Sequence, residues 1–249
     1  MNKKIAEFSL SLLAALGVAG PVMAQTQTQP TLVGDVGMAV YRTPQIAAST
    51  EKPTTVLPYV YADYGDLYAR VDTFGYKLTP MGAGHLELVT RLSFEGYQPT
   101  NSAIGKRERP KPIGVGTFQE THYGGFFAYA FHDASSGGSL LDASYAAELQ
   151  FGGLHVYPQL GFERRDRKYV DALYGVSAAE SARSGLTAYA ANNSITPNAA
   201  VALEYPLFDS LKLTFQVRKK WLDKSINDSP LVNTKQQTSS FIAISQTFK

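Results

Sequence analysis

Apolar and polar residues alternate along most of this chain with a period of two, which is the pattern of β-strands that present two different faces. In 153–163, "GLHVYPQLGFE", Val156 and Phe162 share the apolar face, whereas His155 and Glu163 lie on the polar one. The same alternation runs through these segments: 32–41, 56–63, 67–78, 85–95, 123–131, 140–150, 199–205, 211–218 and 239–248. The pattern predicts an all-β chain of about ten strands, or twelve if "GVGTF" at 114–118 contributes as well.

Two architectures produce such strands, and they differ in what the apolar face contacts. In a soluble β-sandwich this face packs into a core, whereas in an outer-membrane barrel it contacts lipid and the polar face lines the lumen. The polar faces here carry charges of both signs that can neutralise one another in a lumen: Glu87, Arg91, Glu95, Asp142, Glu148, Glu163, Glu204, Lys212 and Arg218. Short turns alternate with long connections at 101–122, 165–197 and 221–237, as they do in barrels. We therefore expect an antiparallel transmembrane β-barrel of about 10 (10–12) strands.

Both ends of the chain agree with export to the outer membrane. Lys3 and Lys4 precede the apolar run "FSLSLLAALGVAG", which is too short to span a bilayer, and Ala24 ends a small-residue cleavage motif. We expect residues 1–24 to be a cleaved signal peptide, residues 25–249 to form one barrel domain, and the protein to reside in the cell outer membrane. The last strand carries Phe248, which is typical of a barrel-assembly signal, although Lys249 follows it.

Composition narrows the classes of function. The chain has no Cys, which excludes disulfides and thiolate metal sites. Removal of Lys3, Lys4 and Glu7 with the signal peptide lowers the formal net charge from +2 to about +1, which argues against bulk electrostatic capture of nucleic acid. The His residues show no metal-ligand spacing, and His132–Asp133 lacks the opposing Asp pair that an outer-membrane protease of the omptin type would use. The sequence thus predicts a protein that is not an enzyme and has no catalytic, cofactor or metal site.

The segment 174–189, "YGVSAAESARSGLTAY", resembles a helix within this β pattern. Ser177 and Glu180 form an S-x-x-E capping box, and Gly185 stands where a helix would end. Ser177 has no neighbouring His to activate it, so a catalytic role is not supported. We expect one short helix in an extracellular loop, folded back over the barrel mouth through flanking apolar residues such as Leu173 and Leu186.

The run 106–112, "KRERPKP", is strongly basic. Its prolines exclude a central strand and keep the segment extended. Counting ten strands back from a periplasmic C-terminus places the connection 101–121 in the periplasm. Candidate contacts for a periplasmic partner or for anionic groups are therefore Lys106, Arg107, Arg109 and Lys111; the alternative is a solvated loop.

Two segments carry a family resemblance. Residues 173–189, "LYGVSAAESARSGLTAY", and residues 227–232, "NDSPLV", resemble loop motifs of the MipA/OmpV family of outer-membrane proteins, the MltA-interacting scaffold proteins. The matching motif positions are Gly175, Ser177, Ser184, Gly185, Leu186, Tyr189, Asp228, Ser229 and Pro230. Tyr174 stands where the family usually has Phe, which is typical of a divergent member.

The resemblance implies a lipid-embedded barrel that acts as a scaffold, bringing a periplasmic lytic transglycosylase and a murein synthase together in peptidoglycan assembly. Two alternatives stay open: a small porin-like channel, and a surface adhesin that acts through the loops 165–197 and 221–237. A barrel of about ten strands is only slightly wider than an eight-stranded one, whose interior is filled by side chains. We therefore expect a plugged lumen rather than an open pore.

Overall fold

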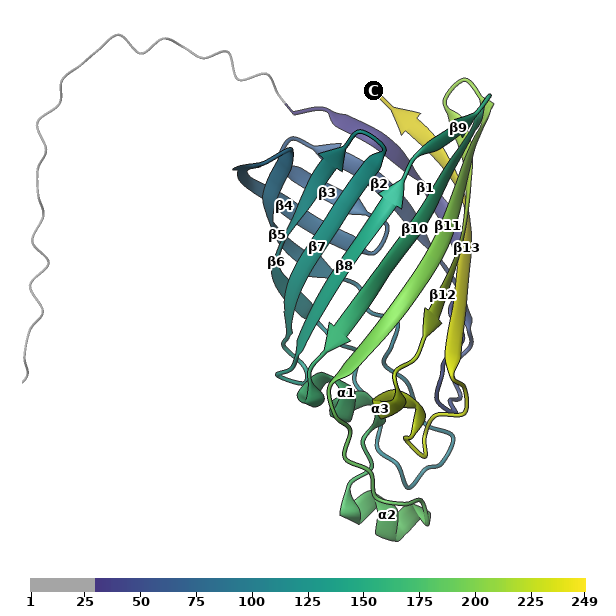
Figure 1. The fold of residues 1–249 in the computed structure, drawn as a ribbon. Coiled ribbons are helices and arrows are strands. Elements are labelled where there is room, and N and C mark those ends of the chain that lie inside the picture. Colours follow the sequence, from purple (N-terminus) through teal and green to yellow (C-terminus); the bar gives the residue numbers. More distant parts are fainter. Residues whose placement is uncertain (1–29) are drawn as a thin grey trace, which may run out of the picture.

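Twelve antiparallel strands form a closed barrel in the computed structural model, which describes residues 30–249 (Figure 1). The strands are β1 (Leu32–Arg42), β2 (Thr54–Tyr64), β3 (Leu67–Arg70), β4 (Thr73–Met81), β5 (Gly84–Arg91), β6 (Pro112–Thr121), β7 (Gly124–Asp133), β8 (Ser139–Ala147), β10 (Leu154–Arg165), β11 (Ser194–Phe208), β12 (Leu211–Trp221) and β13 (Gln236–Phe248). Each strand pairs with its neighbours in sequence, and β1 pairs with β13 to close the ring. The short β9 (Leu149–Phe151) continues β8 beyond a break at Glu148 and pairs with β10 without adding a position to the ring. The predicted signal peptide, 1–24, lies outside the described residues.

The expected count of about ten strands is wrong, because two strands escape the alternation pattern. The segment 67–78, predicted as one strand, contains a sharp turn between β3 and β4, where Val71 adopts a φ of 64°. β6 carries glycines on its interior face, since a Cβ on Gly116 would lie 2.0 Å from Cδ1 of Tyr129. Glycines between Ile113, Val115 and Thr117 create no regular polar face, so this strand lacks the usual signature of alternation.

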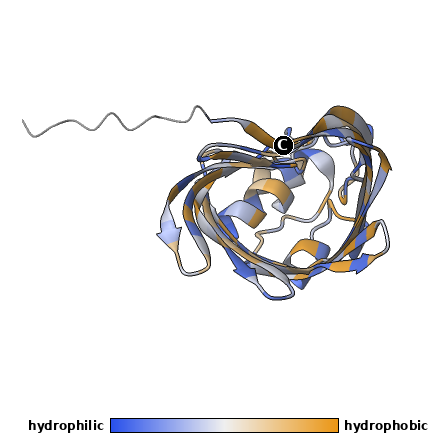
Figure 2. Ribbon diagram, turned by 90° about the horizontal axis from the view of Figure 1, so that it is seen from above, coloured by the Kyte–Doolittle hydropathy of each residue, from blue (hydrophilic) through white to orange (hydrophobic). Residues whose placement is uncertain are grey.

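The outer face of the barrel is apolar and the inner face is largely polar, which is the reverse of a soluble protein. On β13, Ile242 and Ile244 are 47% and 52% exposed, whereas Ser245 on the inner face is 1% exposed. Figure 2 shows hydrophobic and hydrophilic positions alternating along the wall. The outward apolar side chains include Met38, Val40, Val56, Leu78, Leu88, Ile113, Val115, Leu141, Leu160, Phe162, Ile195, Val201, Phe215, Ile242 and Ile244. Such a band is the lipid-facing surface of a membrane barrel and excludes the sandwich.

The two ends of the barrel differ in the length of their connections. Short turns at 65–66, 82–83, 122–123, 152–153 and 209–210 lie at the end that also holds the C-terminus and the start of β1, which we call the turn end (Figure 1). The connections 43–53, 92–111, 166–193 and 222–235 lie at the opposite end, the loop end.

The count of ten strands placed 101–121 at the same end of the barrel as the C-terminus, and this part of the prediction is wrong. The second half of this segment is β6, and its first half lies at the loop end, in contact with the connection 166–193. The count of ten omits β6. Because each strand crosses the barrel once, adding β6 moves the connection before it to the opposite end of the barrel.

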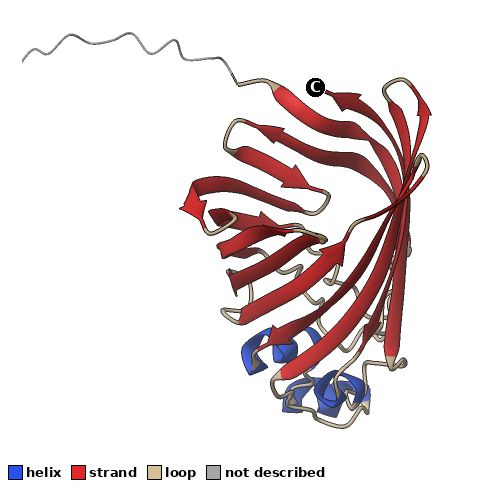
Figure 3. Cartoon of the chain, turned by 45° about the horizontal axis from the view of Figure 1, so that its top comes forward, coloured by secondary structure: helices blue, strands red, loops and turns tan. Residues whose placement is uncertain are grey.

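Three helices lie at the loop end, where Figure 3 shows them gathered beneath the strands. They are α1 (Arg167–Tyr174), α2 (Ala178–Ser184) and α3 (Lys224–Asn227). α2 is the predicted helix, whereas α1 and α3 were not expected. α1 begins directly after β10, and Oδ1 of Asp166 accepts a hydrogen bond from the backbone N–H of Tyr169, which is an N-cap that the sequence alone suggests only weakly. No helix among residues 30–249 is long and apolar enough to cross a membrane.

The main hydrophobic core lies at the loop end, inside the mouth of the barrel. It combines side chains from all four long connections with inward residues of β5, β7 and β8, including Val89 and Phe131. We call the loop contribution the plug; its buried members are Ile46, Ala47, Tyr97, Ile104, Tyr169, Val170, Leu173, Tyr174, Val176, Ala191, Ile226 and Leu231. The apolar faces of the strands point outward to lipid, so they cannot form a buried core. The loops therefore supply most of the main hydrophobic core.

Candidate functional site

Hydrogen bonds between distant loops hold the plug together. The Tyr97 hydroxyl donates to the carbonyl oxygen of Leu173 at 2.8 Å, and Oγ of Ser229 donates to that of Tyr174 at 2.6 Å. The Tyr189 hydroxyl donates to the carbonyl oxygen of Ser225 at 2.8 Å. These bonds satisfy buried polar groups and tie 92–111, 166–193 and 222–235 into one unit.

The two loop motifs found in the sequence thus meet in space and build the plug. Ser177 is the N-cap of α2, and its capping box with Glu180 is present as predicted. Gly185 ends α2 with a φ of 74°, a conformation that favours glycine. The other residues of the first motif lie nearby: Gly175 is the C-cap of α1, the Ser184 hydroxyl accepts a hydrogen bond from the Leu186 N–H, and Tyr189 forms a β-bridge with Val176. In the second motif, Asp228 is the C-cap of α3, and Pro230 is exposed beside Ser229.

Glu180 anchors the basic run to α2. Its Oε1 accepts the Gly105 N–H at 3.0 Å and lies 3.1 Å from Nη1 of Arg107. Burial raises the pKa of Glu180, but the backbone N–H groups of Ser177 and Gly105 and the Arg107 side chain together lower that pKa to about 2. Glu180 is therefore ionised at any physiological pH, and a catalytic role as an acid or base is not supported.

The four candidate partner contacts divide into one structural residue and three exposed ones. Arg107 is only 12% exposed and also donates to the carbonyl oxygen of Gly175 at 2.7 Å. Lys106, Arg109 and Lys111 are exposed at the loop end, where Arg109 lies 3.5 Å from Glu51. They do not lie at the turn end, where the sequence placed them.

The polar stretch after β7 forms a closed turn. Asp133 is buried and accepts hydrogen bonds from the N–H groups of Lys111 and Ser136 at 2.6 and 2.9 Å. The Ser136 hydroxyl donates to the same carboxylate at 2.5 Å, and the Ser135 hydroxyl donates to the carbonyl oxygen of Arg109. Every group in this stretch that resembles a catalytic residue, apart from the exposed His132, is used to hold the turn.

A cavity of about 570 Å³ occupies the lumen below the plug. Its wall includes most of the predicted lumen charges: Arg91, Glu95, Asp142, Glu148, Glu163, Glu204 and Arg218. Glu87 is buried beside Tyr68, whose hydroxyl donates to it at 2.7 Å, and Lys212 lies between Asp35 and Glu204 at 3.1 and 2.9 Å. A barrel of twelve strands thus keeps free interior volume that the expectation of a filled, ten-stranded barrel did not include.

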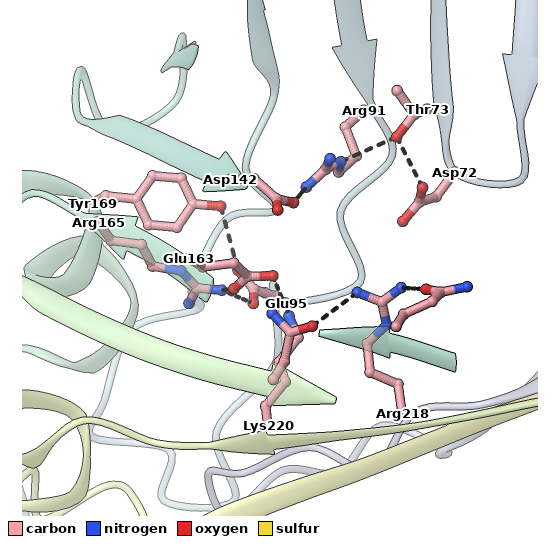
Figure 4. A network of polar contacts seen from close by, with 12 residues as sticks. Asp72, Thr73, Arg91, Glu95, Asp142, Glu163, Arg165, Tyr169, Arg218 and Lys220 are labelled. Carbon is pink, nitrogen blue, oxygen red and sulfur yellow. Dashed lines mark hydrogen bonds and ion pairs between the residues drawn. The ribbon is translucent and has the colours of Figure 1, made fainter. Parts of the chain in front are cut away.

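Ion pairs line the cavity near the plug residue Tyr169 (Figure 4). Arg165 bonds both Glu95 and Glu163 at 2.5 Å, and Lys220 lies 2.7 Å from Glu163. Arg91 pairs with Asp142 at 2.5 Å across the barrel wall. These pairs satisfy charges that are largely removed from water; one cluster links β5 to β8, and the other links β10 to β12.

The sequence reasoning missed four charged residues of this interior: Arg70, Asp72, Arg165 and Lys220. Arg165 and Lys220 each lie two residues beyond a recognised lumen charge, Glu163 and Arg218, so extending the alternation by one step would have found them. Asp72 lies in the turn between β3 and β4, which carried no signal. Among residues 30–249 no group of His, Asp or Glu side chains is arranged to hold a metal ion.

Two relatives of this chain are named for the outer membrane or for a binding partner. YiaT of Escherichia coli (strain K12), whose name describes it as an outer membrane protein, is 25% identical over 236 residues, which cover 92% of this chain and 95% of YiaT. The MltA-interacting protein of Escherichia coli (strain K12) is 31% identical over 99 residues, 40% of each chain.

Two solved structures were also matched. The outer membrane channel DcaP of Acinetobacter baumannii has a TM-score of 0.38 at 11% identity, covering 88% of this chain and 96% of that one. OprB of Pseudomonas putida has a TM-score of 0.35 at 9% identity, covering 88% and 94%.

A family profile matches almost all of the described chain. The profile described as MltA-interacting protein MipA matches residues 36–248, from the first strand of the barrel to the last. Together with the closed barrel and its apolar belt, this places the protein in the outer membrane. The chain belongs to the MipA family.

Proposed function

We propose that this protein is a non-catalytic outer-membrane scaffold that binds a periplasmic enzyme of the cell wall through its turn end. The observation that carries the proposal is the plug, a buried hydrophobic cluster that the long loops build at one mouth of the barrel, whereas the other mouth has only short, exposed turns. Outer-membrane barrels place short turns in the periplasm and long loops outside. On this arrangement the turn end faces the periplasm and the plug faces the exterior.

The chemistry of the turn end suits a basic partner surface. Asp66, Glu120 and Asp209 stand exposed in or beside three of its turns. Carboxylates on a rim steer a positively charged partner and set its orientation. The relative named MltA-interacting protein supports a lytic transglycosylase as this partner. The murein synthase that the family resemblance implies would be the second protein brought to the scaffold.

Capture by the immobilised barrel tests the proposal. Purified lytic transglycosylase is passed over wild type, over Asp66→Asn/Glu120→Gln/Asp209→Asn, and over a loop-end control, Lys106→Ala/Arg109→Ala/Lys111→Ala. We expect the turn-end variant to capture at least about 10-fold less enzyme at low salt, and the loop-end control to match wild type. Equal capture by all three, or loss in the loop-end control alone, contradicts the proposal.

A small channel is the second candidate, and the cavity of about 570 Å³ is the observation that favours it. In planar bilayers the scaffold hypothesis predicts a folded but electrically silent barrel, because the plug seals the loop end. Discrete conductance steps from the wild-type protein would favour the channel.

A further inference from the structure

Besides Glu148, which is exposed at the turn end and lies 3.5 Å from the His155 imidazole, two charged groups that line the cavity have no partner of opposite charge within 4.0 Å among residues 30–249. The Arg218 guanidinium donates to the neutral side chains of Asn198 and Gln159, at 3.3 and 3.1 Å. The Asp72 carboxylate accepts a hydrogen bond from the hydroxyl of Thr73 at 3.0 Å. Both differ in this respect from Arg91, Arg165 and Lys220, which are paired with carboxylates of the same cavity.

Both groups lie on the wall of one cavity. Figure 4 shows the Arg218 guanidinium, from β12, and the Asp72 carboxylate, from the turn between β3 and β4, extending into the interior. Asn198 and Gln159 hold the guanidinium by two of its donors, which leaves its other N–H groups available to a ligand. A guanidinium held in this way is pre-organised to bind a carboxylate.

The backbone next to Asp72 is strained. Val71 adopts a φ of 64°, which is rare for a β-branched residue and costs roughly 1–3 kcal/mol. Two backbone hydrogen bonds maintain this turn: the Val71 N–H donates to Val60 at 2.8 Å, and the Leu92 N–H donates to the carbonyl oxygen of Asp72 at 2.8 Å. The fold thus holds Asp72 at the cavity wall against a local conformational cost.

The charge balance of the cavity selects the class of ligand. Its wall carries five cations, Arg70, Arg91, Arg165, Arg218 and Lys220, and six carboxylates, Asp72, Glu95, Asp142, Glu148, Glu163 and Glu204. An anion alone gains no long-range attraction from such a wall. A ligand with one charge of each sign adds no net charge and pairs with both of these groups, neither of which has an ion-pair partner of its own.

Aromatic rings provide an apolar surface in the same cavity. The Tyr41 and Phe241 rings are 5.2 Å apart, and the Tyr59 and Phe241 rings are 5.8 Å apart. Phe94 stacks on Tyr41 at 6.2 Å. All four residues line the cavity, so an aliphatic or aromatic substituent of a ligand has a surface to pack against.

We propose that the lumen is a binding site for a small zwitterionic solute of the short-peptide class. Its carboxylate pairs with Arg218, its ammonium group pairs with Asp72, and its side chains pack on the aromatic surface. A cavity of about 570 Å³ falls within the range that holds ligands of this size. The solute enters from the turn end, opposite the mouth that holds the plug. This site does not depend on the scaffold function.

Calorimetric titration of the refolded, detergent-solubilised barrel with leucyl-leucine tests the site. Three probes accompany it: N-acetyl-leucyl-leucine, which has only the carboxylate; N-acetyl-leucyl-leucine amide, which has neither charge; and inorganic phosphate. We expect leucyl-leucine to bind and each of the others to bind at least about 10-fold more weakly, because each loses one or both charged pairs. Equal binding of phosphate would indicate a plain anion site, and equal binding of the uncharged amide would indicate a hydrophobic one; either result overturns the proposal, as does absence of binding at millimolar dipeptide.

Variants locate the two contacts. Arg218→Gln and Asp72→Asn should each weaken leucyl-leucine binding by about 10-fold or more, and Arg218→Lys should weaken it less than Arg218→Gln. Asp72→Asn should leave the already weak affinity for N-acetyl-leucyl-leucine unchanged, whereas Arg218→Gln should reduce it further. Arg183→Gln, which makes the same exchange in exposed α2, is the matched control and should bind like wild type. Unchanged affinity in both lumen variants, with heat-modifiable migration showing that they are folded, contradicts the assignment.

Discussion

The loop end and the turn end of this barrel differ in both core and charge. The loop end holds a buried hydrophobic plug, whereas the turn end has only short turns. Exposed bases outnumber the exposed carboxylates Glu108 and Asp228 at the loop end: Arg42, Lys52, Lys106, Arg109, Lys111, Arg167, Lys168, Arg183, Lys224 and Lys235. At the turn end the exposed carboxylates Asp66, Glu120, Glu148 and Asp209 outnumber the one exposed base of the described residues there, Lys249. A nearly neutral chain therefore presents two oppositely charged ends, each suited to a different neighbour.

The difference between the two ends also indicates where stability resides. Strands whose outward faces contact lipid add little packing inside the barrel, so long loops that fold into the mouth are the part that resembles a soluble core. The turn end needs no such core because tight turns satisfy their own backbone groups. Substitutions that affect one end of the barrel and not the other test this view.

The largest effect should come from removing a plug side chain. Leu173 is 2% exposed, so Leu173→Ala should destabilise the loop end by about 2–5 kcal/mol through lost burial and the cavity left behind. Hydrogen exchange of amides in 166–193 measures this change. The matched control is Leu207→Ala at the turn end, where Leu207 is 38% exposed and the effect should stay below about 1 kcal/mol. Similar losses for both leucines would mean that the plug is not the core.

A smaller effect should follow from breaking the Arg107–Glu180 pair. The two side chains are 12% and 11% exposed, so Arg107→Gln leaves a largely buried carboxylate without its cation and should cost about 2 kcal/mol. Protease sensitivity of 176–189 reports this loosening. Arg109→Gln is the control, since Arg109 is exposed and its contact with Glu51 should contribute less than about 1 kcal/mol. If both substitutions have the same effect, the pair does not anchor α2.

Acid should loosen the loop end through the same carboxylate. The pKa of Glu180 is about 2 in the folded protein against an ordinary value of 4.5, so the unfolded loop binds more protons and the stability from this group is lost as pH falls from about 4.5 toward 2. At pH 3 the loss should be on the order of 1–2 kcal/mol relative to pH 7. Hydrogen exchange of 176–189 followed against pH measures it. Glu180→Gln should remove this part of the pH dependence, and an unchanged profile in that variant would assign the acid response to other groups.

The smallest effect should come from the helix cap. Ser177→Ala removes the hydroxyl that accepts the Glu180 N–H and should cost about 1 kcal/mol, confined to α2. Ser177→Asp, which retains a capping oxygen, should restore most of it. Circular dichroism is too insensitive for a helix this short, so amide exchange at Ser181 and Gly185 is the suitable measurement. Loss of the whole plug in Ser177→Ala would show that α2 is coupled to the core more tightly than its exposed position suggests.

Much of the fold followed from local pattern. The alternation predicted ten of the strand regions, the capping box predicted α2, and the polar faces identified seven side chains that line the cavity. The pattern failed where glycine replaces a polar residue, as in β6, and where a turn is made by a strained valine, as at Val71. Both failures have one cause. The glycine in β6 leaves room for the Tyr129 ring, and the turn at Val71 holds Asp72 at the cavity wall. Both features depend on tertiary contacts, which neighbouring residues in the sequence do not encode.

By itself, the sequence determined an exported β-barrel with an apolar outer face, a charged interior and a capped helix between two motif segments. Only the tertiary structure decided which end each loop occupies, because a single additional strand reverses the direction of the chain. It also decided that Arg107 is an internal anchor, and that Arg218 and Asp72 share one cavity without charged partners. Alternation is a property of neighbouring residues, whereas ion pairing depends on strands that closure of the barrel brings together.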